Sequence, residues 1–154
     1  MEYGSIEREI HVEASPEVVY EVVSTPEHLA AWWPDEVEME PVPGATGMLA
    51  FGDSASPDRH VEPLTVVEAD PPRRFSFRWV YDEGVTAAPG NSLLITFDLV
   101  PTDAGTLLRM TESGFREKGW EAAVLEAQYR DHASAWDYYL ARLAPYVAKL
   151  VSAP

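Results

Sequence analysis

The feature that most constrains the fold is a change of hydrophobic period near residue 114. Between residues 36 and 114, apolar and polar side chains alternate, which is the pattern of strands with one buried face. After Gly114, apolar residues recur three and four positions apart, which is the pattern of an amphipathic helix. The order of the two patterns predicts an α+β fold, in which an antiparallel sheet is followed by one long helix.

About seven strands are expected. Residues 5–12 alternate with Ile6, Ile10 and Val12 on one face, and six more strands follow in the region of period two. Turn residues separate these strands, and short connections between successive strands produce an antiparallel meander. The strongest aromatic ladder comprises Phe75, Phe77, Trp79 and Tyr81. The six later strands are expected near residues 36–41, 46–52, 60–69, 73–81, 92–100 and 105–113.

Two short helices are predicted after the first strand. Ser15 and Thr25 are each followed by proline and glutamate, which supplies an N-cap hydroxyl, a proline at the first helical position and an acid in the first turn. Pro34 is expected to end the second helix, because proline lacks the N–H that a helix interior requires.

The long helix is expected to begin near Trp120 and to run for about 26 residues, or roughly 39 Å. Pro145 is expected to kink or end it, which leaves residues 146–151 as a last turn or tail. Its apolar side must be buried, so the helix is expected to lie across the sheet. The positions that define this side are Trp120, Ala123, Val124, Ala127, Ala135, Trp136, Tyr139, Leu140 and Leu143.

Composition excludes several classes of protein. The net charge is −15, and residues 116–154 contain equal numbers of acidic and basic groups, so the whole excess lies in the first 115 residues. Such a field repels phosphate and anionic lipid, so neither nucleic acid nor a membrane surface is expected as a partner. No apolar run approaches the ~20 residues of a membrane span. A single domain over residues 1–154 is expected.

Cysteine and histidine usage limits the chemistry further. There is no cysteine, so disulfides and thiolate sites are excluded, and a cytoplasmic location is expected since no secretory signal is visible. The four histidines lack the paired spacing of a zinc site. Neither a metal nor a cofactor is expected, and no catalytic residue is assigned.

Several short segments together resemble a known family. Thr25-Pro26-Glu27-His28-Leu29 leads into Trp32-Trp33, Asp70-Pro71-Pro72-Arg73-Arg74-Phe75 precedes Trp79, and Glu112-Ser113-Gly114-Phe115 precedes Trp136. In this order they resemble the family named for the C-terminal domain of the activator of Hsp90 ATPase, within the START-like (SRPBCC) superfamily. The resemblance implies a helix-grip fold, in which a curved sheet wraps the C-terminal helix with a hydrophobic cavity between them.

His132 is the strongest candidate for a polar residue that acts on a ligand. Gln128, His132 and Trp136 are spaced four apart, so all three are expected to face the sheet. His132 and Gln128 would then contact the polar end of a ligand, or His132 would transfer a proton. The alternative is a histidine at the edge of the core that is hydrogen-bonded to a strand side chain.

Aromatic side chains are expected to line the cavity, although for most of them a place in the core is the stronger expectation. Arg78 and Arg109 alternate with inward residues and are expected on the outer face; pointing inward, either would meet a ligand carboxylate. The expected lining is Trp32, Trp33, Phe51, Phe77, Trp79, Phe97, Met110, Phe115, Trp120, Gln128, His132 and Trp136.

Three functions follow from the resemblance. The leading one is binding of a small hydrophobic molecule without established catalysis. The second is an enzyme, a polyketide cyclase, aromatase or hydrolase, which the apparent scarcity of acid–base pairs in the cavity disfavours. The third is an interaction module for an Hsp90-type chaperone, through the acidic surface. Whether the chain forms a homodimer is left open.

Overall fold

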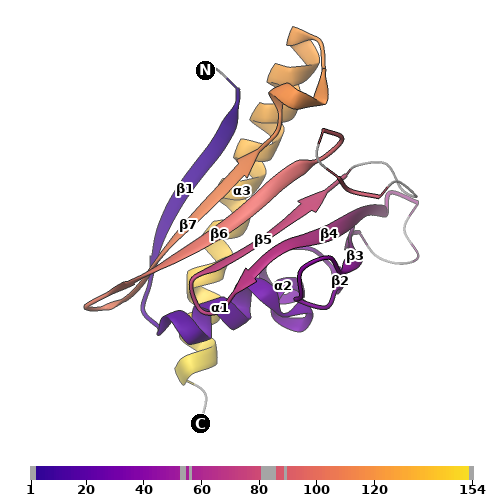
Figure 1. Cartoon of the computed structure of the whole chain (residues 1–154). Helices are drawn as coiled ribbons and strands as arrows, with labels where there is room; N and C mark the ends of the chain where they lie inside the picture. Colours follow the sequence, from indigo (N-terminus) through magenta and orange to yellow (C-terminus); the bar gives the residue numbers. More distant parts are fainter. Residues whose placement is uncertain (1–2, 53–54, 56, 81–85, 89, 153–154) are drawn as a thin grey trace.

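The computed structural model describes residues 3–52, 55, 57–80, 86–88 and 90–152. Seven strands form one sheet in the order β1-β7-β6-β5-β4-β3-β2, and every neighbouring pair is antiparallel (Figure 1). The predicted meander is therefore confirmed, with β1 joining its far edge beside β7. The strands are β1 Ser5–Val12, β2 Glu36–Glu38, β3 Thr46–Phe51, β4 His60–Asp70, β5 Arg74–Trp79, β6 Leu93–Thr102 and β7 Gly105–Ser113.

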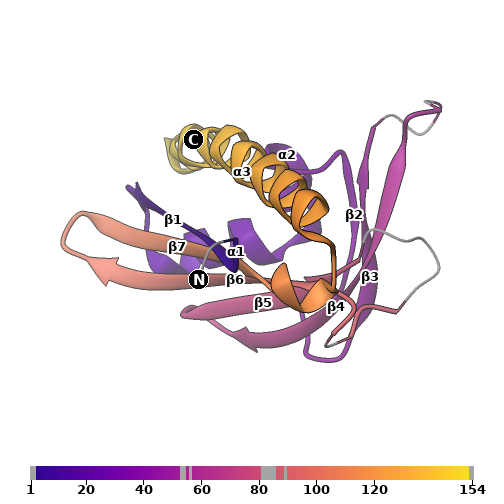
Figure 2. The same cartoon turned by 90° about the horizontal axis from the view of Figure 1, so that it is seen from above.

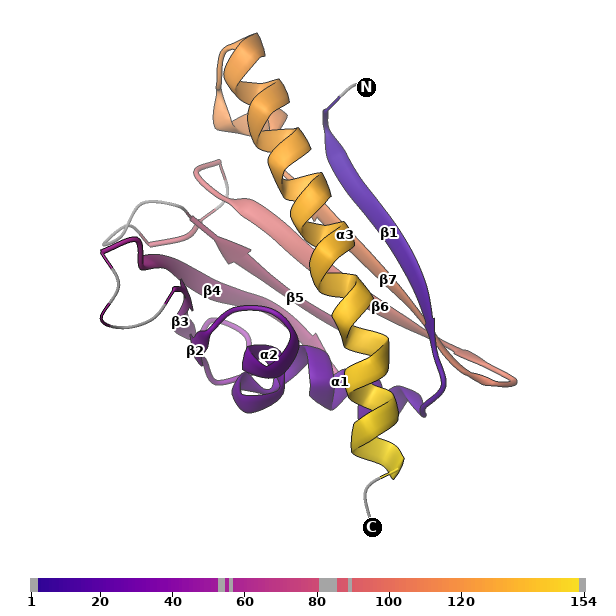
Figure 3. The ribbon, with the colours of Figure 1, turned by 180° about the vertical axis from the view of Figure 1, so that it is seen from behind.

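All three α-helices lie on one face of the sheet. Helices α1 (Pro16–Ser24) and α2 (Pro26–Trp32) lie at one end of that face, and α3 (Ala122–Ser152) crosses it (Figures 1 and 3). Seen from above, the sheet curves upward beside α3 where β2, β3 and β4 lie (Figure 2). This is the predicted α+β helix-grip arrangement, and it leaves the helix side as the face where a site can be enclosed.

The two short helices begin where the sequence predicts. Ser15 caps α1, since its Oγ accepts a hydrogen bond from the Val18 N–H at 3.3 Å. Thr25 occupies the N-cap of α2, but its side chain makes no capping bond, so that part of the expectation is wrong. The Thr25 N–H also bonds the Glu21 carbonyl and thereby closes α1. One residue thus ends one helix and begins the next.

Helix α3 differs from the prediction at both ends. It continues through Pro145 to Ser152, because Val147 beyond the proline is buried and holds the last turns against the domain. Near its start, Ala123 and Ala127 are exposed, whereas Leu125 and Tyr129 pack against the core. The larger side chains take the inner positions because they remove more apolar surface from water than alanine does.

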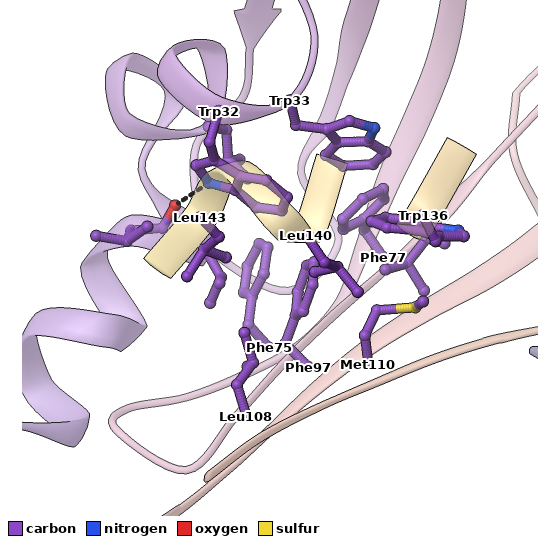
Figure 4. Packing of buried hydrophobic residues seen from close by; sticks show 14 of the residues in the cluster. Trp32, Trp33, Phe75, Phe77, Phe97, Leu108, Met110, Trp136, Leu140 and Leu143 are labelled. Carbon is purple, nitrogen blue, oxygen red and sulfur yellow. Dashed lines mark hydrogen bonds between the residues drawn. The ribbon is translucent and has the colours of Figure 1, made fainter. Parts of the chain in front are cut away.

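The core lies between the sheet and the helices. In Figure 4, Trp32, Trp33 and Trp136 lie among aromatic and aliphatic side chains from the sheet and from α3. The Trp32 indole N–H donates to the Val22 carbonyl at 3.1 Å, so this fully buried ring has its polar atom satisfied. The aromatic ladder of β5 is confirmed for Phe75 and its alternate neighbours, while Tyr81 lies outside the described residues.

Within the described part of the chain, none of the helices combines the length and the apolar character needed to cross a membrane.

Candidate ligand site

The ends of four neighbouring strands lie side by side at one end of the sheet, next to the first half of α3. Because neighbouring strands are antiparallel, the beginnings of β4 and β6 lie beside the ends of β5 and β7. Inward side chains at these ends therefore come together although they are far apart in sequence. A group of polar side chains lies between this end of the sheet and α3. We call it the polar cluster and define it as Glu62, Trp79, Glu112, His132 and Trp136.

Glu112 is the centre of the polar cluster. It follows Leu108 and Met110 on the inward face of β7 and is fully buried. Its carboxylate accepts three ring N–H bonds, each at 2.9 Å: Trp79 Nε1 donates to Oε2, and Trp136 Nε1 and His132 Nδ1 donate to Oε1. A buried carboxylate needs such donors, because leaving it without partners costs several kcal/mol. Glu112 therefore joins α3 to β5 and β7.

His132 is held in one orientation by this bond. It lies one helical turn before Trp136, and its ring contacts Trp79 and Phe115 edge-on, with centroid distances of 5.7 and 5.4 Å. Burial lowers the pKa of His132, but its hydrogen bond to Glu112 and the negative charge there outweigh burial, so the pKa is raised overall. Since Nδ1 donates to Glu112, only Nε2 is left for contact with a ligand.

Glu62 has a different environment. It projects inward from β4 and is 9% exposed, with Oε1 3.4 Å from His60 Nε2. Its Oε2 is buried and, among the described residues, has no hydrogen-bond partner. Burial raises the pKa of Glu62 to about 8; the positive charge of His132 opposes this shift and the negative charge of Glu112 adds to it. Glu62 is therefore a protonated, neutral acid at pH 7.

Two cavities adjoin the polar cluster. One has a volume of about 170 Å³ and the other about 250 Å³, and Glu62, Trp79 and His132 line both. The larger also has the aromatic residues Trp33, Phe51, Trp136 and Tyr139 in its wall, together with His60, Asp131 and Ala135. The smaller is completed by Val80, Leu93, Lys118, Trp120 and Gln128.

The expected lining divides into two groups. The first group lines one or both cavities and comprises Trp33, Phe51, Trp79, Trp120, Gln128, His132 and Trp136. The second group is almost completely buried in the core and lines neither cavity; it comprises Trp32, Phe77, Phe97, Met110 and Phe115. The structure brings Gln128 and His132 to the same cavity, as their helical spacing predicts.

Sequence reasoning missed both carboxyl groups. The signal was present, since Glu112 continues the inward positions of Leu108 and Met110, and Glu62 precedes Leu64 and Val66 on the inward face of β4. The same alternation that places the apolar residues inward therefore also places these two glutamates inward. His60, Lys118 and Tyr139 also join the walls without having been expected.

The expected scarcity of acid–base pairs at the cavity does not hold. His132 pairs with Glu112 at 2.9 Å, and His60 lies 3.4 Å from Glu62. The arginines do lie outside the cavity: Arg109 is exposed and pairs with Glu9 at 3.6 Å, and Arg78 alternates with the inward Phe77 and Trp79. Across the described residues, no three His, Asp or Glu side chains are grouped as a metal site.

Comparison with known proteins gives one family and one fold. The model of the family described as Activator of Hsp90 ATPase homolog 1-like protein matches residues 13–148. No curated protein matches the chain. A crystal structure from Mesorhizobium loti has a TM-score of 0.75 at 20% identity, and the match covers 94% of this chain and 97% of that one.

Two further structures have the same fold. The Aha1 dimer from Colwellia psychrerythraea has a TM-score of 0.66 at 21% identity, covering 93% of this chain and 95% of that one. DynU16, a protein of the dynemicin biosynthetic locus, has a TM-score of 0.73 at 21% identity, covering 94% of this chain and 47% of that one. Identities of this size establish a shared fold alone.

Proposed function

The chain belongs to the family of Activator of Hsp90 ATPase homolog 1-like proteins, and on that premise we propose that it binds a small hydrophobic molecule between its sheet and α3. The observation that carries this proposal is the cavity of about 250 Å³, walled by aromatic rings with polar groups at one place. Ligand pockets have this composition, because apolar walls supply affinity and a few polar groups set the orientation. The cysteine-free composition supports a cytoplasmic location for this binder.

The size of the cavity limits the ligand. A cavity of about 150 Å³ in an apolar core accommodates benzene. The larger cavity here, about 250 Å³, is therefore suited to a molecule with two or more rings or an equivalent acyl chain. Trp33, Phe51 and Tyr139 supply flat apolar surfaces on which such a molecule packs.

Titration with N-phenyl-1-naphthylamine, a neutral probe that fluoresces in apolar surroundings, tests the proposal. Ala135 lines the larger cavity, so Ala135→Phe fills it and should weaken probe binding about tenfold. Ser134 is the adjacent, exposed residue, and Ser134→Phe adds the same ring outside the cavity. Affinity unchanged in both variants, or no saturable binding to the wild type, would count against a cavity ligand.

A second candidate function is acid–base catalysis on the bound molecule. It is favoured by two groups in one cavity wall whose environments differ: His132 bonded to Glu112, and Glu62 held as a neutral acid. DynU16, from a biosynthetic locus, has the same fold. The assay is deuterium incorporation from D₂O into the methyl group of 2-acetylnaphthalene, since proton removal next to a carbonyl needs a base and an acid of this kind. A His132→Gln rate equal to that of the wild type would exclude His132 as the base.

A further inference from the structure

The buried oxygen of Glu62 gives the site a chemical preference. Oε2 has no hydrogen-bond partner among the described residues, and the residue lines both cavities. A buried polar atom without a partner destabilises the protein, because it has lost its hydrogen bonds to water. A ligand that supplies the missing partner recovers this cost on binding. Glu62 is therefore a wall residue that gains from a polar contact.

The charges around Glu62 come from every element packed against it. His60 lies beside it on β4, Glu112 faces it from β7, and Asp131, His132 and Tyr139 belong to α3. Lys118, from the turn before α3, lines the smaller cavity. Burial dominates over these groups and holds the pKa of Glu62 near 8, so its carboxyl group keeps an O–H at neutral pH. A neutral carboxylic acid in an apolar site can donate this O–H to a carbonyl oxygen.

Both negatively and positively charged ligands are disfavoured by the charged groups around the cavities. A carboxylate would lie near the buried negative charge of Glu112, and Arg109, which would offer it a partner from inside, is on the outer face. An ammonium group would meet His132 in either cavity and Lys118 in the smaller one, while the wall of the larger cavity also contains Asp131. Like charges in a poorly solvated site repel strongly, so each of these ligands loses affinity.

We propose that the cavity selects an uncharged molecule bearing a carbonyl-type oxygen, to which Glu62 donates a hydrogen bond. This inference rests on the proposed small-molecule binding and adds the chemical class of the ligand's polar end. The aromatic walls hold the apolar body of the molecule, and Glu62 sets its orientation.

Four probes of one shape separate the alternatives by calorimetry at pH 6.5. 2-Acetylnaphthalene carries the carbonyl, 2-isopropylnaphthalene has no polar end, 2-naphthoate is an anion and 1-(2-naphthyl)ethylamine is a cation. The wild type should bind 2-acetylnaphthalene at least about tenfold more tightly than each of the others. Raising the pH to 9.5 should lower the affinity of the wild type for 2-acetylnaphthalene about tenfold, because Glu62 ionises and loses its O–H.

Two variants assign the preference to Glu62. Glu62→Gln retains an N–H donor, so it should keep the preference for the ketone and lose its pH dependence. Glu62→Leu has no donor, so its affinities for the ketone and for 2-isopropylnaphthalene should become equal. Thermal melts of both variants confirm that the comparison is made on folded protein.

The contrary results are distinguishable. If Glu62→Leu keeps the ketone preference, or if the anion or the cation binds the wild type as tightly as the ketone, this inference is wrong while small-molecule binding stands. If none of the four probes binds and N-phenyl-1-naphthylamine does not bind, both the inference and the proposed function are wrong.

Discussion

Glu62 and Glu112 belong to one polar cluster, but their carboxyl groups have different environments: Glu62 lines both cavities, whereas Glu112 is fully buried behind them. Glu112 accepts three N–H bonds at 2.9 Å, whereas Glu62 has one histidine nitrogen at 3.4 Å and an oxygen without a partner in the described chain. Hydrogen bonding compensates the burial of Glu112, and protonation compensates the burial of Glu62. The first group holds the fold together, and the second remains available to a ligand.

The stability of the protein should therefore depend on pH through Glu62. The folded pKa of Glu62 is raised from an ordinary value of 4.5 to about 8, so the unfolded chain releases this proton first. Its contribution to stability is complete below pH 4.5 and is lost at about 1.4 kcal/mol per pH unit as the pH rises toward 8. Glu62→Gln removes this loss.

Urea unfolding of Glu62→Gln and wild type at pH 5 and pH 7.5 measures the effect. The advantage of the variant in free energy of unfolding should increase by about 3 kcal/mol between the two pH values. Taking the difference between the proteins cancels the titration of the surface carboxylates, which are distant from Glu62. A difference that does not change with pH would show that Glu62 is ionised in the folded protein.

Trp136 combines packing with one of the bonds to Glu112. It is 2% exposed, and its ring lies 4.9 Å from that of Trp33. Trp136→Ala should lower the free energy of unfolding by about 3–5 kcal/mol, the usual cost of deleting a large buried aromatic side chain. Trp136→Phe keeps much of the bulk and loses only the N–H donor, so it should cost about 1–2 kcal/mol. A loss below 1 kcal/mol for the alanine variant, by chemical denaturation, would refute this packing role.

At the scale of the elements, the end of α3 is where sequence reasoning was least exact, since it left open an end at Pro145 and the helix continues to Ser152. Proline disfavours a helix interior by about 3 kcal/mol, so Pro145 was expected to kink or end the helix. Tertiary contacts override this local preference, since Val147 is buried and the Tyr146 hydroxyl is hydrogen-bonded to His28 Nδ1 at 2.6 Å. These contacts depend on where α2 lies, which local sequence does not reveal.

A matched pair of substitutions tests whether the helix beyond Pro145 is docked. Val147 is 1% exposed and Val151 is 49% exposed, and both follow the proline on α3. Val147→Ala should cost about 1.5–3 kcal/mol, because it removes buried methyl groups and leaves a cavity. Val151→Ala should change stability by less than about 0.5 kcal/mol. Equal, small effects in both would mean that the last turns are detached from the domain.

At the scale of the whole molecule, the hydrophobic periodicity predicted the sheet, the long helix and the order of the helices and strands along the chain. It also placed Gln128 and His132 on one face, since helical spacing is a local property. The meeting of Glu62 with Glu112 was not predictable in this way. Their electrostatic interaction depends on which strand ends lie side by side at one end of the sheet, and that is a property of the topology.

The topology also explains why the candidate site lies at one end of the sheet. Antiparallel order brings the inward residues of β4, β5 and β7 under the first half of α3, and the indole N–H groups of Trp79 and Trp136 point at one carboxylate. Trp32 is bonded instead to the backbone of α1 and lies outside the walls of both cavities. The chain thus contains reporters inside the site and a reference outside it.

Indole N–H signals in a ¹H–¹⁵N NMR titration with N-phenyl-1-naphthylamine test the central claim most directly. Binding in the cavity predicts saturable shifts of the Trp33, Trp79 and Trp136 signals, whose side chains line the larger cavity, with the Trp32 signal nearly unmoved. Signals of Trp79 and Trp136 that stay in place at saturating probe, or that move no more than that of Trp32, would contradict a ligand site between the sheet and α3.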